Sequence, residues 1–216
     1  MIDLLVKATF ETLYMVIVSA IFTVAIGLPL GIILVVTSKN HIAENRWISG
    51  VLSYVVNMTR SLPFIILMIF IIPITRWLIG TSIGTEAAIV PLVFAAIPFF
   101  ARVVESALHE VDDGVIEAAI AMGATPLQII VRVMIPEALP SLILGVTITI
   151  INLLGYSAMA GAIGGGGIGD LAIRYGYHRF RTDVMLMTIL LLVALVQGIQ
   201  SSGNLVAQKI IKNRRK

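Results

Sequence analysis

Long apolar runs constrain this chain more than any other feature of its sequence. A helix that crosses the hydrocarbon core of a bilayer needs about 20 predominantly apolar residues, and five runs of roughly that length lie between polar breaks. They cover residues 13–36, 48–74, 87–104, 139–162 and 184–206. The sequence therefore predicts an all-α integral membrane protein with about five transmembrane helices.

The composition points to the same class. Of the 216 residues, 58% are hydrophobic and 12% charged, and the mean hydropathy is +1.02, whereas a soluble domain is about half apolar and a quarter charged. The absence of cysteine excludes a disulfide framework, a thiolate metal site and a cysteine nucleophile. The net charge is +3, but the basic residues are scattered or gathered in the C-terminal tail, which favours a role in membrane orientation over nucleic-acid binding.

A few polar residues interrupt the apolar runs. Asn57, Arg60 and Pro63 break the second run and predict a kinked or partly re-entrant segment whose polar atoms face protein or water. Two roles for Arg60 remain open: it could contact an anionic group of a substrate, or it could anchor the kink. Arg102 and Glu105 are three residues apart on one helix face, so we expect them to form an ion pair.

The chain is expected to form one membrane domain over residues 1–216, because no repeat, low-complexity tract or linker divides it. A signal peptide is the alternative interpretation of the first run. That run is too long for one, Asp3 and Glu11 spoil a basic leader, and no small-residue cleavage site follows. We therefore expect the first run to be a retained span.

A polar segment of residues 110–136 separates the third and fourth runs and predicts two short helices joined by a tight bend. Asp113 can cap a helix that begins at Gly114, and Gly123 can adopt the left-handed conformation that ends it.

The second helix has a start signal of its own. Thr125 and Gln128 have the spacing of a capping box, and Pro126 occupies the first helical position, where its missing N–H costs nothing.

This segment resembles the EAA loop of bacterial ABC-importer permeases. Glu-Ala-Ala at residues 117–119, Gly123 and Val-Met-Ile-Pro at residues 133–136 follow the family order, with Val133 and Ile135 in place of the usual Ile and Leu. The resemblance implies that residues 114–122 form a cytoplasmic coupling helix that inserts into a groove of a separate ATPase, and that small side chains suit close docking. An ordinary surface helical hairpin is the alternative. The small residues that suit this docking are Ala118, Ala119 and Ala121, and the coupling residues that follow from the resemblance are Glu117, Ala118, Ala119, Gly123, Ala124, Thr125 and Pro126.

The chain lacks the sequence signature of an ATPase. A P-loop needs a Gly-Lys pair after its glycine-rich stretch, and no such pair occurs. We therefore expect a non-catalytic subunit without a metal or cofactor of its own, while the resemblance implies that ATP and Mg²⁺ bind to the partner ATPase. Gly164, Gly166 and Gly169 have dinucleotide-motif spacing, but they follow an apolar run and not a strand. We interpret residues 161–169 as a flexible external re-entrant turn.

Candidate catalytic and metal-binding groups are not arranged for chemistry. His41, His109 and His178 fall in separate loops without ligand-like spacing, and no serine or acid forms a nucleophile–base grouping. The acids Glu110, Asp112 and Asp113 could suggest a metal site, but acids that open a helix more simply act as caps and partners of the helix dipole.

Three further stretches resemble the methionine ABC-importer permease family. They are Arg-Ser-Leu-Pro-Phe-Ile-Ile at residues 60–66, Gly-Thr-Ser-Ile-Gly at residues 80–84 with Ala-Ala-Ile-Val-Pro at residues 87–91, and Gly-Tyr-Ser-Ala-Met at residues 155–159. The resemblance implies a homodimer with a pathway along its axis, two cytoplasmic ATPase subunits, and an extracytoplasmic methionine-binding protein. Alternating access would be driven by closure of the ATPases.

A pathway for a zwitterion with a thioether should combine small and soft apolar residues. Tyr156, Ser157 and Met159 fit this description, and ordinary helix packing is their alternative role. Together with Arg60 they are the candidate pathway and gate residues.

Basic residues near the ends of the runs predict the orientation. If residues 110–136 are cytoplasmic, nine basic residues lie inside and five outside, which follows the positive-inside rule. The inside set is Lys39, Arg46, Arg102, Arg132, Lys209, Lys212, Arg214, Arg215 and Lys216, and the outside set is Lys7, Arg76, Arg174, Arg179 and Arg181. The resemblance implies the bacterial cytoplasmic (inner) membrane, and the basic residues then predict that the N-terminus lies outside and the C-terminus in the cytoplasm.

Other classes of function remain as alternatives. The substrate could be another amino acid or a small polar solute. An ion-coupled secondary transporter would also be apolar, but it usually shows repeated halves and broken helices around an ion site, which are not evident here. A structural membrane scaffold gives no reason for the two capped helices.

Overall fold

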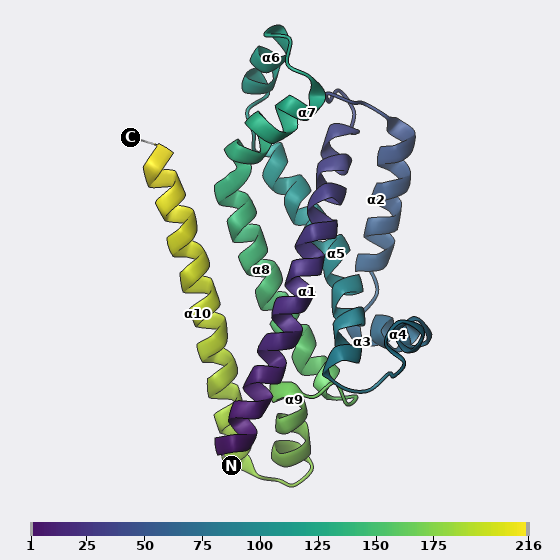
Figure 1. Cartoon of the computed structure of the whole chain (residues 1–216), viewed down its shortest axis with the longest axis vertical. Helices are drawn as coiled ribbons and strands as arrows, with labels where there is room; N and C mark the ends of the chain where they lie inside the picture. The colour runs from purple at the N-terminus through teal and green to yellow at the C-terminus, as the bar shows by residue number, and fades with distance from the viewer. Residues whose placement is uncertain (1, 215–216) are drawn as a thin grey trace. The chain divides into compact units, whose positions relative to one another are not determined.

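The computed structural model describes residues 2–214 and shows only helices and loops over that range (Figure 1). In chain order the α-helices are α1 (Ile2–Val36), α2 (Arg46–Arg60), α3 (Phe64–Phe70), α4 (Ile72–Ile79), α5 (Thr85–His109), α6 (Asp113–Ala121), α7 (Pro126–Ile129), α8 (Ile135–Gly161), α9 (Gly167–Leu171) and α10 (Thr182–Arg214). Two π-helical turns, η1 (Ile130–Met134) and η2 (Ala172–Tyr177), follow α7 and α9. Two basic residues of the tail, Arg215 and Lys216, lie outside the described residues.

Four stretches within the described residues are long and apolar enough to cross a membrane. They are α1, α5, α10 and the continuous run from α7 through α8, and α2 with α3 makes a fifth if this bent pair counts as one span. The predicted all-α fold with about five spans is confirmed. Several helices extend beyond the apolar runs, and α1 already begins at Ile2, because helical backbone continues into polar ends that hydropathy does not mark.

The second apolar run is broken, as its polar residues predicted. Helix α2 ends at Arg60, and Pro63 is the N-cap of α3. Proline has no N–H for an intrahelical hydrogen bond, and it disfavours helical geometry in the residue before it, Leu62. The run continues in α3 and α4, and Gly80 ends α4 in the left-handed conformation with φ of 84°.

The backbone divides into two compact units, with divisions inside α1, α5, α8 and α10 and one more between α2 and α3. The first unit comprises Met1–Thr23, Leu62–Ala96 and Ile148–Ser201, and the second Val24–Ser61, Ile97–Thr147 and Ser202–Lys216. The first unit has a core of α1, α3, α5 and α8 side chains that includes Met15, Phe64, Leu92, Leu153 and Leu154. The second has a core that includes Val35, Phe100, Leu108, Ile129 and Met134.

Glycines allow close helix packing in the second unit. A Cβ added at Gly31 of α1 would lie 2.5 Å from the Cβ of Val104, and one at Gly145 of α8 would lie 2.5 Å from the Cγ1 of Val103. Two helices therefore approach α5 through small residues, as is common where van der Waals packing holds membrane helices together.

The predicted ion pair within α5 is confirmed. Arg102 Nη1 lies 2.5 Å from Glu105 Oε2, and Arg102 Nη2 also donates to the carbonyl of Ser53 at 3.3 Å. Both charged side chains are largely buried, so they depend on each other as partners.

Candidate coupling and gate sites

The α6 helix is capped one residue earlier than expected. Asp112 Oδ1 accepts a hydrogen bond from the N–H of Gly114 at 2.8 Å, and α6 begins at Asp113. The prediction that Asp113 caps a helix beginning at Gly114 is therefore wrong by one position. Asp112 has the extended backbone that an N-cap needs, while Asp113 lies in the first turn, where a negative charge favours the helix dipole.

The bend after α6 forms as predicted. Gly123 has φ of +78°, and its N–H donates to the carbonyl of Ile120 at 2.9 Å. The N–H of Ala124 donates to the carbonyl of Ala119 at 3.1 Å. These two hydrogen bonds satisfy carbonyls that the end of a helix leaves unpaired, and the left-handed conformation of Gly123 turns the chain.

The start of the second helix is also confirmed. The N–H of Thr125 donates to Gln128 Oε1 at 2.9 Å, and the N–H of Gln128 donates to Thr125 Oγ1 at 3.4 Å, with Pro126 in the first turn. This helix is not a separate short element, however, because α7 passes through η1 directly into α8. The N–H of Ile135 bonds to the carbonyl of Ile130, five residues earlier. The widened turn directly precedes Pro136, which cannot donate to the preceding turn.

Burial divides the coupling segment into an inner and an outer face. Ile116 and Ala119 of α6 are buried in the core of the second unit. Ala119, which we expected to suit close docking, is 3% exposed, so its methyl group lies inside this core. Figure 1 shows α6 and α7 next to each other. The exposed residues of the segment include Val115, Glu117, Ala118, Ile120, Ala121, Met122, Thr125, Pro126 and Leu127.

A polar groove adjoins the outer face of α6. It has a volume of about 320 Å³ and is lined by Asn40, His41, Ile42, Asp113, Ile116, Glu117 and Ile120. Burial lowers the pKa of His41, repulsion from His109 lowers it further, and the attraction of Asp113 only partly offsets these effects. Sequence reasoning treated His41 as an isolated loop residue, since nothing local indicates that residues 40–42 lie against α6.

The candidate gate residues have different surroundings. The ring of Tyr156 stacks on Phe64 with centroids 4.6 Å apart. Ser157 is 2% exposed, and its hydroxyl donates to the carbonyl of Leu154 on the same helix at 2.7 Å. Met159 is 50% exposed. Arg60 belongs to the second unit, where it is exposed in the last turn of α2.

The glycine run after α8 is packed and not a loose turn. Gly164, Gly166 and Gly167 have positive φ angles, and a Cβ at Gly169 would collide with the backbone of Ala158. The expected close backbone approach is confirmed. The expected flexibility does not fit this packing, because Gly167 and Gly169 are buried.

Side chains of α1 hold the start of α9. The N–H of Gly167 donates to Glu11 Oε2 at 2.8 Å, and the N–H of Ile168 donates to Thr12 Oγ1 at 2.9 Å. Figure 1 shows α9 beside the first turns of α1. Sequence reasoning missed this contact, although an acid and a threonine at the edge of an apolar run were a signal that they have protein partners.

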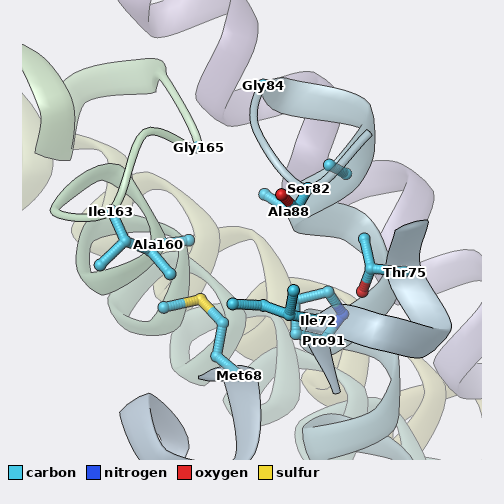
Figure 2. A pocket seen from close by; sticks show the side chains of 11 residues that line it. Met68, Ile72, Thr75, Ser82, Gly84, Ala88, Pro91, Ala160, Ile163 and Gly165 are labelled. Carbon is cyan, nitrogen blue, oxygen red and sulfur yellow. The ribbon is translucent and has the colours of Figure 1, made fainter. Parts of the chain in front are cut away.

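A small cavity lies in the first unit between α3, α4, α5 and the end of α8. In Figure 2 the side chain of Met68 reaches towards Ala160 and Ile163, with Thr75 and Ser82 also at the cavity. Its volume of about 20 Å³ has room for about one water molecule. It is therefore not a binding site for a molecule as large as an amino acid.

Apolar helices of membrane length, joined by a capped surface bend, define a polytopic α-helical membrane protein. Residues 27–212 match the family described as the inner membrane component of binding-protein-dependent transport systems, and the chain belongs to that family. It is therefore the membrane component of a transporter and not an enzyme. Its place is the inner membrane.

Similar proteins carry more specific names. The chain is 53% identical over 208 residues to a probable D-methionine transport system permease protein of Vibrio cholerae, covering 96% of this chain and 92% of the relative. It is 47% identical over 207 residues to a protein of the same name from Pasteurella multocida, covering 96% and 95%. A solved inward-facing structure of a methionine ABC transporter has a chain that matches with a TM-score of 0.96 and 50% identity, covering 97% of both chains.

Proposed function

We propose that this chain is the permease subunit of an ATP-driven importer that carries D- or L-methionine across the cytoplasmic membrane. The observation that carries the proposal is the 53% identity over 96% of the chain with a protein named as a D-methionine permease. The match to a methionine ABC transporter over 97% of both chains supports it. Residues 1–216 would act as one transmembrane domain.

The outer face of α6 and the bend after it would dock a cytoplasmic ATPase. Exposed Glu117 and Ala118, together with Met122 at 82% and Leu127 at 69% exposure, supply polar and apolar contact area. Buried Ile116 instead anchors α6 in the core of this unit. A short helix that is capped at its start and turned sharply at its end can transmit force, because its hydrogen bonds limit bending.

In this proposal two copies of the chain form the pathway, and two ATPase subunits bind ATP and Mg²⁺ on the cytoplasmic side. A binding protein delivers substrate on the other side, where the N-terminus would lie. The C-terminus would lie in the cytoplasm, as the nine basic residues on that side predict.

Exposed Met159 would form the constriction of the pathway. Tyr156 would support it through its stack on Phe64, and the buried Ser157 would act by packing in the helix that carries Met159. Arg60, exposed at the end of α2, remains a candidate contact for an anionic group.

Cysteine crosslinking tests this arrangement without interference, because the native chain contains no cysteine. In a complex with its ATPase, Met159→Cys should crosslink between two copies more in one nucleotide state than in another. Met159→Ala should change uptake or its coupling to ATP hydrolysis, with little loss of assembly. Absence of crosslinks in every nucleotide state, together with normal uptake by Met159→Ala, would place Met159 in ordinary packing.

A further inference from the structure

One face of α8 in the first unit is open along its length. Ile148 is 48% exposed and Met159 50%, Gly155 is exposed, and Asn152 is partly exposed between them. These four positions are separated by four, three and four residues, so they form one stripe on a helix of 3.6 residues per turn.

The opposite face of the same helix is packed. Leu153, Leu154 and Ser157 are each at most 2% exposed. The side chain of Asn152 therefore belongs to the outward stripe, although it is an amide within an apolar span.

The depth of Asn152 makes its polarity significant. It lies nine residues before Gly161, the end of α8, which corresponds to about 14 Å of helix, well inside a hydrocarbon core of about 30 Å. No side-chain hydrogen bond to Asn152 is found within the part of the chain that the structure describes. An amide at this depth must face protein or water and not lipid, because hydrocarbon leaves its donors and acceptor unsatisfied.

The space beside Asn152 is compatible with a passing molecule. A Cβ added at Gly155, less than one turn away, would have no atom within 4 Å. The segment from Ile148 to Gly161 contains no acidic or basic residue, so the amide is not there to pair with a fixed charge on its own helix.

We propose that Asn152 lines the translocation pathway and is a polar contact for the amino-acid zwitterion, one to two helical turns from the Met159 constriction. The proposal deepens the proposed function and rests on it. An amide suits this role because its carbonyl can accept from the ammonium group and its NH₂ can donate to the carboxylate. A neutral side chain holds each end more weakly than an ion pair would, which allows release.

The transport test uses the complete complex of permease, ATPase and binding protein in proteoliposomes. Asn152→Leu keeps the branched shape of four side-chain heavy atoms but removes the amide, and it should lower methionine taken up per ATP hydrolysed by roughly tenfold, which corresponds to one hydrogen bond to a charged group. Asn152→Gln should restore a large part of the loss. The apparent KM should stay near the native value, because the binding protein captures the substrate first. Native uptake per ATP in Asn152→Leu would overturn the substrate contact.

Thiol labelling tests the pathway lining without relying on the substrate. Asn152→Cys should react with a charged, membrane-impermeant methanethiosulfonate in at least one nucleotide state. Leu153→Cys on the packed face and Leu190→Cys, an exposed apolar position of α10, should stay unreactive. Labelling of Asn152→Cys no faster than that of Leu153→Cys in every state would overturn the proposal and indicate a contact between helices. If Asn152→Cys reacts with the reagent but the complex with the unchanged chain does not transport methionine, the proposed substrate is contradicted, while the assignment of Asn152 to the pathway lining stands.

Discussion

Glu11 and Gly167 are joined by a hydrogen bond of 2.8 Å from the backbone N–H of Gly167 to the carboxylate of Glu11, across 156 residues of sequence. Thr12 makes the equivalent contact with Ile168 at 2.9 Å. The first N–H groups of a helix have no partner within it, so α1 supplies two acceptors that α9 lacks. Because Gly169 packs on the backbone of Ala158, this contact also fixes the end of the helix that carries the proposed gate.

Removing the carboxylate should loosen the start of α9. Glu11→Ala should make the amide of Gly167 exchange with deuterium at least tenfold faster, as expected for the loss of a hydrogen bond to a charged acceptor, worth about 1.5–3 kcal/mol. Glu11→Gln keeps an acceptor oxygen and should recover much of the protection. Lys7→Ala removes only the 3.9 Å ion pair to Glu11 and serves as the matched control. Equal exchange in Glu11→Ala and native protein would show that the contact does not hold α9.

Substitutions at Gly123 should impair uptake less when the new residue adopts positive φ more readily. Gly123→Val places a β-branched residue at φ of +78°, at a cost of about 1–3 kcal/mol, and should reduce uptake at equal membrane abundance by reorienting α6. Gly123→Asn should be milder, because asparagine adopts positive φ more readily. Since a Cβ at this position meets no atom within 4 Å, a clash cannot explain a difference between the variants. Equal uptake by the two variants would contradict a role for the bend geometry.

Sequence patterns predicted the features that depend on neighbouring residues. The capping box of Thr125 and Gln128 and the turn at Gly123 each involve positions a few residues apart, so chain order specifies them. The choice between Asp112 and Asp113 as cap failed because both acids suit the position, and only the backbone conformation distinguishes them.

Features that depend on distant packing could not be predicted in this way. Burial of Ala119 requires knowledge of the core beneath α6, and the contact between Glu11 and Gly167 joins segments 156 residues apart. The π-helical turn η1 is another example, since the sequence shows Pro136 but not how the helix continues through it.

The loop beside α6 should be sensitive to pH through His41. Burial and His109 lower the pKa of His41 in the folded protein, so its contribution to stability is complete above the ordinary value near 6.5 and is lost as the pH falls from there through the folded pKa. Intrinsic amide exchange slows as the pH falls, so exchange at residues 38–45 relative to the intrinsic rate should be in excess at pH 5.5 over its value at pH 7.5. His41→Asn should remove the excess, while His178→Asn, in the other unit, should retain it. An excess that persists in His41→Asn would assign the effect to another group.

Apolar contact area on the coupling segment should contribute to ATPase binding. Met122 is 82% exposed next to the bend, and truncation of a residue that contributes strongly to an interface costs more than about 1 kcal/mol. Met122→Ala should therefore lower the affinity of the purified permease for its ATPase by roughly tenfold in a titration. Met187→Ala, at 46% exposure on α10, is the matched control and should bind normally. Equal affinities for both variants would exclude Met122 from the docking surface.

In the proposed function this chain forms a methionine pathway powered by a separate ATPase. The most direct measurement is uptake of radiolabelled methionine into proteoliposomes, comparing the permease alone, with its ATPase, and with both ATPase and binding protein. We expect ATP-dependent accumulation only in the complete complex, and neither ATP hydrolysis nor accumulation by the permease alone. Accumulation by the permease alone under an ion gradient would contradict this expectation, as would a complete complex that hydrolyses ATP but does not move methionine.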